Sequence, residues 1–447
     1  MMDFSTELYR EHLEEAAFLY GQRGVLFKEP DVTWTDLGDF EQRLALHIEA
    51  LVEGGETALQ VCRRQANEGD AGELHAAVRV FCQHKRLDLM REVFDALDVE
   101  DTERVLAAAN GLKNQWPPEW TGEIAALWKD KPQACAALLP RVIGFKRLAT
   151  MDQVLIAALT NASANQLYTL IWALGRIKAQ AAIHVLTPLL RHEETSIASA
   201  AALSLLRMGA AVAMDAAAMQ CAPADFRHLL HLSLAGGSKD VPHLIEQLGD
   251  PECAADPALA LGLLGDIRAV EPLLNLVGHP AAGENAAMAL NLITGADLYQ
   301  EVFVPEEIDP RALFEEELEK LNRGEPLYPP GQEPGSMVTK LTQVPDAWRT
   351  WWGQNRYRFK VEARYRNGRP FTPECLLENL KHEHSPFFLR QIAYEELVAR
   401  YSLDIPFETD MTVQDQLIAL QQLETQLHQT QNRWQPGAWY LAGRSMA

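Results

Sequence analysis

The sequence of 447 residues lacks features that mark several classes of protein. Its six cysteines lie far apart and form no Cys-x-x-Cys pair, which disfavours a disulfide framework and indicates reduced thiols. No uncharged apolar run reaches the roughly 18 to 20 residues that cross a bilayer. The N-terminus carries acidic residues where a secretory signal would be basic. We therefore expect a soluble, cytoplasmic protein without membrane contact.

Positive charge is also scarce. The chain has 40 lysines and arginines against 62 aspartates and glutamates, which gives a formal net charge of −22. Such a surface repels phosphate backbones, so the charge disfavours general binding of nucleic acid. It is typical of a well-solvated protein, and it also suits a basic protein partner.

Linear catalytic motifs are absent from the sequence. It contains no G-x-S-x-G nucleophile elbow, no Walker A loop and no dinucleotide-binding fingerprint after a strand. We therefore predict a protein that is not an enzyme and holds no cofactor or metal. A site assembled from distant segments remains open.

What the sequence does contain is a repeat. Glycines recur every 28 to 34 residues at the apparent ends of helices, which fits two helices of about 12 residues with two short turns. We expect these glycines to adopt the left-handed conformation that ends many helices. The glycines are Gly144, Gly175, Gly209, Gly237, Gly265 and Gly295.

The helices between these glycines have the pattern of a stacked array. Val270, Leu273, Leu274 and Val277 repeat at i, i+3, i+4 and i+7, which places them on one helical face. Alanine-rich partner helices allow close packing between layers. The sequence predicts an all-α fold whose repeats span residues 71–300, preceded by an N-terminal helical cap over 1–70.

The composition changes after the last of these glycines. Residues 301–340 are first acidic and then rich in proline and glycine, which is typical of a linker. In the C-terminal module, 341–447, alternating apolar residues from Phe359 to Tyr365 precede Asn367-Gly368, a pattern that predicts a short β-hairpin. The rest of the module is predicted to be mostly helical.

The Leu-Gly-x-x-x-Ala-x-x-x-Leu rhythm resembles the HEAT repeat in its phycobilisome-lyase-like form, over roughly residues 75 to 300. The resemblance implies a HEAT-like α-solenoid. The N-terminal EEAAFLYGQR and the C-terminal W-x-x-W-W with RYRNGRP resemble an uncharacterised proteobacterial family often encoded near type VI secretion genes. That family has no established activity, so the resemblance implies a context and no catalytic residues.

A basic and aromatic segment, Trp348–Pro370, is the most unusual local feature. It places seven basic residues among three tryptophans, two tyrosines and a phenylalanine in an otherwise acidic chain. Arginine and aromatic residues are enriched at binding hot spots. The alternative is that the tryptophans only seal the C-terminal module against the last repeat. The candidate contact residues are Trp348, Trp351, Trp352, Arg356, Arg358, Tyr365 and Arg366.

Histidines offer two weaker metal hypotheses. Cys221, His228, His231 and His243 are near one another in sequence, but no carboxylate or second close pair lies in the same segment. His-Glu dipeptides at 192–193 and 382–383 resemble those of the di-iron HEAT-repeat hydroxylases, represented by deoxyhypusine hydroxylase. Only two copies occur where that family uses four.

The leading functional hypothesis is a non-enzymatic scaffold or adaptor that binds another protein. By resemblance, the partner would be a secretion-system component or an effector, for which the chain would serve as immunity protein or chaperone. Two alternatives are a metal-dependent HEAT-repeat enzyme and a nucleic-acid-binding HEAT protein resembling the alkylpurine glycosylases.

Overall fold

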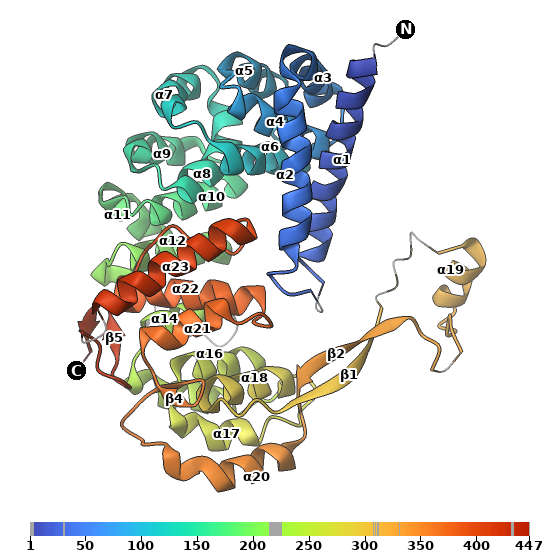
Figure 1. The fold of residues 1–447 in the computed structure, drawn as a ribbon. Helices are drawn as coiled ribbons and strands as arrows, with labels where there is room; N and C mark the ends of the chain where they lie inside the picture. The colour runs from blue at the N-terminus through green and yellow to red at the C-terminus, as the bar shows by residue number, and fades with distance from the viewer. Residues whose placement is uncertain are drawn as a thin grey trace.

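A computed structural model describes residues 4–29, 32–213, 226–306, 308, 310, 313–329, 331–430 and 433–446. The described chain is predominantly helical, with three small two-stranded antiparallel sheets in its last third (Figure 1). Among these residues, no helix combines the length and the apolar character needed to cross a bilayer. The N-terminal helices are α1 (Phe4–Leu26), α2 (Leu37–Glu53) and α3 (Gly55–Glu68).

The main structural element of the fold is a single row of helices, in which each helix packs against the next one. The row consists of α4 (Ala71–Gln83), α6 (Thr102–Gln115), α8 (Pro132–Lys146), α10 (Ala164–Arg176), α12 (Thr195–Arg207), α14 (Phe226–Ala235), α16 (Ala255–Leu264) and α18 (Gly283–Thr294). The helices between them are α5 (Leu87–Ala96), α7 (Thr121–Asp130), α9 (Asp152–Ala158), α11 (Ile183–Leu186), α15 (Val241–Gln247) and α17 (Val270–Leu274). Short 3-10 helices join several of them: η1 (Pro118–Trp120), η2 (Ala149–Met151), η3 (Leu159–Asn161), η4 (Gln180–Ala182), η5 (Thr187–Arg191), η6 (Ser238–Asp240) and η7 (Ile267–Ala269).

Three of the recurring glycines end helices as the sequence predicts. Gly209, Gly265 and Gly295 have φ angles of 71°, 76° and 58° just beyond α12, α16 and α18. A side chain is disfavoured in this left-handed region, which explains why glycine occurs there.

The same prediction is wrong for the other three glycines. Gly144 and Gly175 lie inside α8 and α10, and Gly237 has a φ of −132°. A Cβ atom on Gly175 would lie 2.7 Å from the Cβ of Ser204 on the next helix of the row. At this position glycine serves close helix packing, because any side chain would collide with α12.

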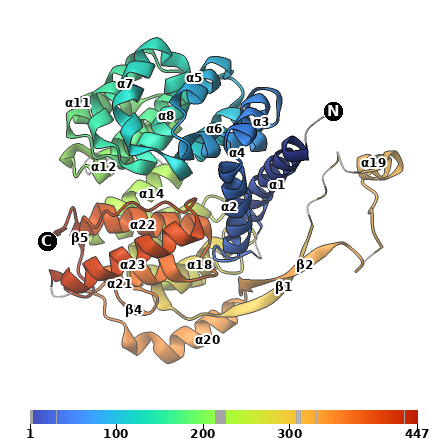
Figure 2. The ribbon, with the colours of Figure 1, turned by 45° about the horizontal axis from the view of Figure 1, so that its top comes forward.

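Residues 301–340, expected to be a linker, contain a β-ribbon. Strand β1 (Tyr299–Pro305) pairs antiparallel with β2 (Gly335–Leu341), with Tyr299 opposite Leu341. The ribbon projects from the helical body and carries α19 (Glu315–Asn322) at its far end (Figures 1 and 2). Sequence patterning missed the strands because the ribbon is largely exposed and has no single apolar face.

The predicted hairpin is confirmed, but it is shorter than the alternation suggested. Strand β3 (Tyr365–Arg366) pairs with β4 (Arg369–Pro370) around Asn367 and Gly368, which both have positive φ. Both turn residues therefore have the backbone that a two-residue hairpin prefers. A second small hairpin joins β5 (Tyr440–Leu441) to β6 (Arg444–Ser445).

The C-terminal helices fold back onto the row. They are α20 (Pro345–Asn355), the 3-10 helix η8 (Arg356–Arg358), α21 (Pro373–Lys381), α22 (Phe387–Tyr401) and α23 (Val413–Thr430). Helix α22 contacts α12 and α14, while α23 contacts α2, as both ribbon views show (Figures 1 and 2). Trp34 and Leu37 from the N-terminal region share one hydrophobic core with α21, α22 and α23.

Buried ion pairs hold the returning helices in place. Arg147, Arg176 and Arg207 lie at the ends of α8, α10 and α12, spaced like the glycine repeat. Arg176 contacts Glu395 and Glu408 at 2.6 Å each, Arg207 contacts Glu395 at 2.6 Å, and Arg147 contacts Glu408 at 3.1 Å. Each of these three arginines therefore has a carboxylate supplied by the C-terminal part of the chain.

Candidate functional site

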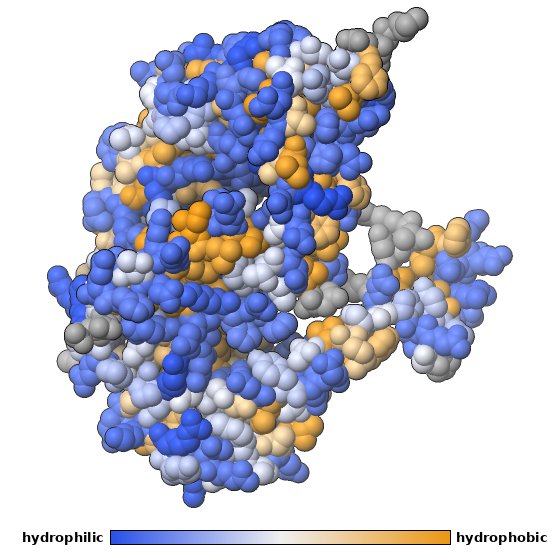
Figure 3. All heavy atoms as spheres, in the orientation of Figure 1, coloured by the Kyte–Doolittle hydropathy of each residue, from blue (hydrophilic) through white to orange (hydrophobic). Residues whose placement is uncertain are grey.

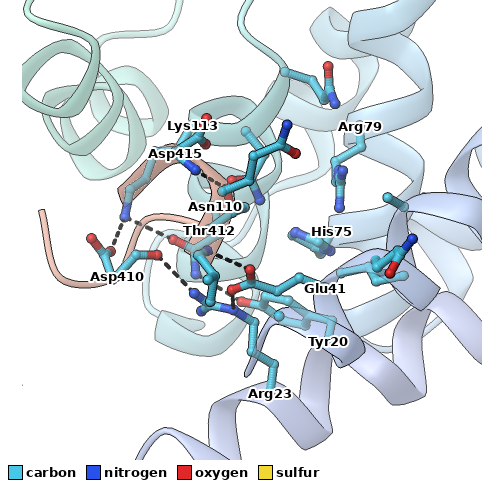
Figure 4. A pocket seen from close by; sticks show the side chains of 18 of the residues that line it. Tyr20, Arg23, Glu41, His75, Arg79, Asn110, Lys113, Asp410, Thr412 and Asp415 are labelled. Carbon is cyan, nitrogen blue, oxygen red and sulfur yellow. Dashed lines mark hydrogen bonds and ion pairs between the residues drawn. The ribbon is translucent and has the colours of Figure 1, made fainter. Parts of the chain in front are cut away.

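A pocket of about 720 Å³ lies where the N-terminal helices meet the C-terminal part of the chain. Its walls come from α1, α2, α4 and α6, with one residue of α8 and the segment from Asp410 to Leu417 at the start of α23 (Figure 4). A volume of this size accommodates a small molecule or a short segment of a peptide.

One edge of the pocket is held by a carboxylate, Glu41 on α2. It accepts a hydrogen bond of 2.7 Å from Nε of Arg23 on α1 and one of 2.6 Å from the backbone N–H of Val413. Arg23 also donates to the carbonyl oxygens of Asp410 and Met411, at 3.2 and 3.1 Å. Glu41 and Arg23 form an ion pair with each other and hold the start of α23 in place. Their main role is therefore to hold this wall of the pocket together.

A second cation, Lys113 on α6, is paired in the same way. Its Nζ lies 2.5 Å from a carboxylate oxygen of Asp410 and 4.7 Å from the ring centre of Phe145. Burial by itself raises the pKa of Asp410, but Lys113 and Arg23 outweigh it and hold that pKa below its ordinary value. Asp410 is therefore an anion that neutralises Lys113.

Arg79 differs from these two cations because it forms no ion pair with a described residue, and the carboxylate of Glu41 favours its charged form only from beyond ion-pair distance. It lies on α4 and is 8% exposed, and it forms no hydrogen bond or ion pair with any residue that the structure describes. Figure 4 shows its guanidinium group directed into the pocket toward His75. Burial lowers the pKa of Arg79 to about 10, so the side chain still carries its charge at neutral pH.

His75 lies one helical turn before Arg79 and is only 1% exposed. Its ring stacks on Tyr20, with ring centres 3.9 Å apart, and its Nδ1 has no hydrogen-bond partner among the described residues. Burial, followed by the charges of Arg79 and Arg23, holds the pKa of His75 well below 6.5. The imidazole is therefore neutral at pH 7, with one ring nitrogen unsatisfied.

Most of the remaining pocket lining is amide or apolar, apart from Glu49, Thr412 and Asp415. Amide side chains offer a donor and an acceptor at adjacent atoms, which matches a peptide group. Leu46 and Leu417 are 58% and 52% exposed, and Figure 3 shows apolar surface over α23 beside the hollow on this face. The amide residues are Gln42, Asn110, Asn114, Gln115 and Gln414.

The basic and aromatic segment lies elsewhere, around α20 and the β3–β4 hairpin. Trp348 is buried and donates from Nε1 to the carbonyl oxygen of Thr342 at 2.7 Å. Trp351 and Trp352 are half-buried, and Trp352 donates to Glu271 on α17 at 3.0 Å. These tryptophans pack α20 against the end of the helix row.

The arginines of this segment divide into two groups. Tyr365 and Arg366 are buried, and Arg366 contacts Glu396 at 2.9 Å, beside Arg364 at 2.8 Å from the same carboxylate. Arg356 and Arg358 are exposed on η8. The structure thus brings the predicted contact residues into one region, but only the η8 arginines and the edges of two tryptophans are accessible to a partner.

The candidate metal residues are not brought together. His192-Glu193 and His382-Glu383 lie in separate exposed turns, before α12 and after α21. Cys221 and the side chain of His228 lie outside the described residues. Within the part of the chain that the structure describes, no group of three histidine, cysteine, aspartate or glutamate side chains has an arrangement that would hold a metal ion.

Sequence reasoning missed the pocket, although α4 contains a signal for it. The helix reads AGELHAAVRVFCQ, and all but its second and last residues are buried. A histidine and an arginine four residues apart in such an apolar helix need partners, which the rest of the helix does not offer. The other lining residues come from separate helices and from Asp410–Leu417, more than three hundred positions away, and no local pattern connects them.

No protein-family model matches the sequence of the chain, and no curated protein matches it.

Proposed function

We propose that this chain is a HEAT-like α-solenoid that acts as a non-enzymatic scaffold, and that a segment of a partner protein enters the pocket beside Arg79. Successive packing along the helix row and the glycine period of 28 to 34 residues support the repeat architecture. The N-terminal helices would be the cap that covers the first repeat.

The single observation that carries the binding role is the unpaired cation in an open pocket. Leaving a buried charge without a counterion lowers stability, whereas Arg23 and Lys113 in the same pocket are both paired. Such a loss of stability is typical of a binding site, because a ligand that supplies the missing counterion restores the lost free energy. Amide groups around the cation favour a peptide as that ligand.

Display of random peptides on phage tests this proposal. Wild-type protein should enrich related sequences, and the variant Ala45→Phe, which narrows the pocket, should lose them. Ala50→Phe is the matched control, since Ala50 lies on the same helix outside the pocket lining. Thermal unfolding would verify that both variants fold. Failure to enrich any sequence, or equal enrichment by Ala45→Phe, would refute the proposal.

The identity of the partner remains a prediction from resemblance alone: a secretion-system component, or an effector that needs an immunity protein or chaperone. The exposed arginines of η8 offer a second contact area for the same partner.

A further inference from the structure

We propose that the group seated deepest in the pocket is a single carboxylate, held jointly by Arg79 and His75. This inference rests on the proposed peptide-binding function and specifies what the pocket recognises. The carboxylate comes from either the C-terminus of the bound segment or an aspartate or glutamate side chain within it.

The geometry of α4 supports a seat made of two donors. His75 and Arg79 are four residues apart, so they lie on the same face of the helix, and both line the pocket. Nδ1 of His75 and Nε of Arg79 are buried without hydrogen-bond partners. A carboxylate with two oxygens would satisfy the planar guanidinium and the neutral imidazole together.

The charges of the lining limit the ligand to one negative charge at this position. Arg23 and Lys113 already form ion pairs with Glu41 and Asp410, so Arg79 is the one described cation of the lining that forms no ion pair. Glu49 and Asp415 add exposed negative charge to the same lining. A phosphate carries nearly two negative charges at pH 7 and would exceed what Arg79 compensates.

The remainder of the site suits the body of a peptide. The stacked Tyr20 and the exposed Leu46 and Leu417 provide apolar contact, while Gln42 and Gln414 provide amide groups. Because each peptide group has one donor and one acceptor, these amides would hold the main chain without selecting a particular sequence.

Fluorescence anisotropy with pools of short, N-acetylated, degenerate peptides separates the possible sources of the carboxylate. One pool has an amidated C-terminus and no acidic residue, and a second has a free C-terminal carboxylate. A third is amidated with a central glutamate, and a fourth is amidated with a central phosphoserine. We expect the second or the third pool to bind about tenfold or more tightly than the first, and the phosphoserine pool to show no such gain.

Variants of the full chain complete the test. Arg79→Met should lower the affinity for the preferred pool to that for the uncharged pool. His75→Gln should lower this affinity less, because the substitution removes only the neutral partner. The control is Arg10→Met, which makes the same arginine-to-methionine substitution on the exposed face of α1. It should leave binding unchanged.

The outcomes are distinct. If the uncharged pool binds as tightly as the carboxylate pools, or if Arg79→Met retains the preference, the carboxylate inference fails while peptide binding stands. The carboxylate inference is also overturned if the phosphoserine pool binds most tightly of the four. If none of the pools binds, the proposed function fails together with it.

Discussion

Replacing Arg79 by methionine should make the unliganded protein more stable. The side chain is 8% exposed and forms no hydrogen bond or ion pair with the described residues, so the carboxylate of Glu41 offsets only part of the cost of burying its charge. Methionine retains much of the volume of arginine and removes the charge. Replacing a buried ionic group by an apolar one of similar size is often neutral or stabilising.

The size of this effect follows from the pKa of the guanidinium group. Burial lowers the pKa of Arg79 from 12.5 to about 10. At about 1.4 kcal/mol for each pH unit, the charged form costs ~3 kcal/mol relative to the unfolded chain. The cost applies in full at neutral pH, which lies below both values, so Arg79→Met should raise the free energy of unfolding by up to ~3 kcal/mol.

The matched control is Arg176→Met, the same substitution at a paired position. Arg176 is buried between Glu395 and Glu408, so its removal takes one of the two arginines from each buried carboxylate and should cost ~3–5 kcal/mol. Thermal unfolding followed by circular dichroism, with both variants compared with wild type at pH 7, measures the difference. If Arg79→Met lowers the unfolding temperature as Arg176→Met does, the reasoning about an uncompensated cation is refuted.

Three further predictions concern the packing of the C-terminal helices onto the row and the packing within the row. Glu396→Gln should destabilise the chain by ~3–5 kcal/mol, because Glu396 is the carboxylate paired with three buried arginines, whereas Glu424→Gln at an exposed ion pair should have no measurable effect on thermal unfolding. Although burial raises the pKa of Glu395, its two arginines outweigh burial and hold that pKa below 4.5. The stabilising contribution of Glu395 is therefore complete above pH 4.5 and is lost as the pH falls through the lowered pKa. When the unfolding temperature is measured against pH, it should fall more steeply in wild type than in Glu395→Gln at pH values below about 4.5. Gly175→Ala should lower the free energy of unfolding by ~1–3 kcal/mol because the new methyl group meets Ser204, whereas Gly122→Ala, which meets nothing within 4 Å, should be neutral or slightly stabilising.

Much of the helical order could be predicted from the sequence, because it depends on local patterns. The stripe of apolar residues in α2 follows the helical period, and Leu37, Leu44 and Ile48 are all buried. The Asn367-Gly368 hairpin was predictable for the same reason, since two left-handed residues in succession specify a tight turn.

The role of the arginines could not be predicted, because it depends on partners far away in the sequence. Arg364 and Arg366 sit in a segment that looks basic and exposed, yet both are buried against Glu396. Arg176 finds Glu408 more than two hundred residues later. Leu417 shows the converse error: its spacing from Val413 and Leu420 predicts one buried apolar face, but it is 52% exposed at the pocket.

Photo-crosslinking in cells tests the central claim most directly, because it compares the two candidate contact surfaces. A benzophenone amino acid would replace either Gln414, which is exposed at the pocket, or Tyr357, which is 82% exposed on η8. We predict a protein adduct of defined mass from the Gln414 position that disappears when Arg79→Met is added. An adduct from the Tyr357 position alone, or one from Gln414 that persists with Arg79→Met, would contradict the account.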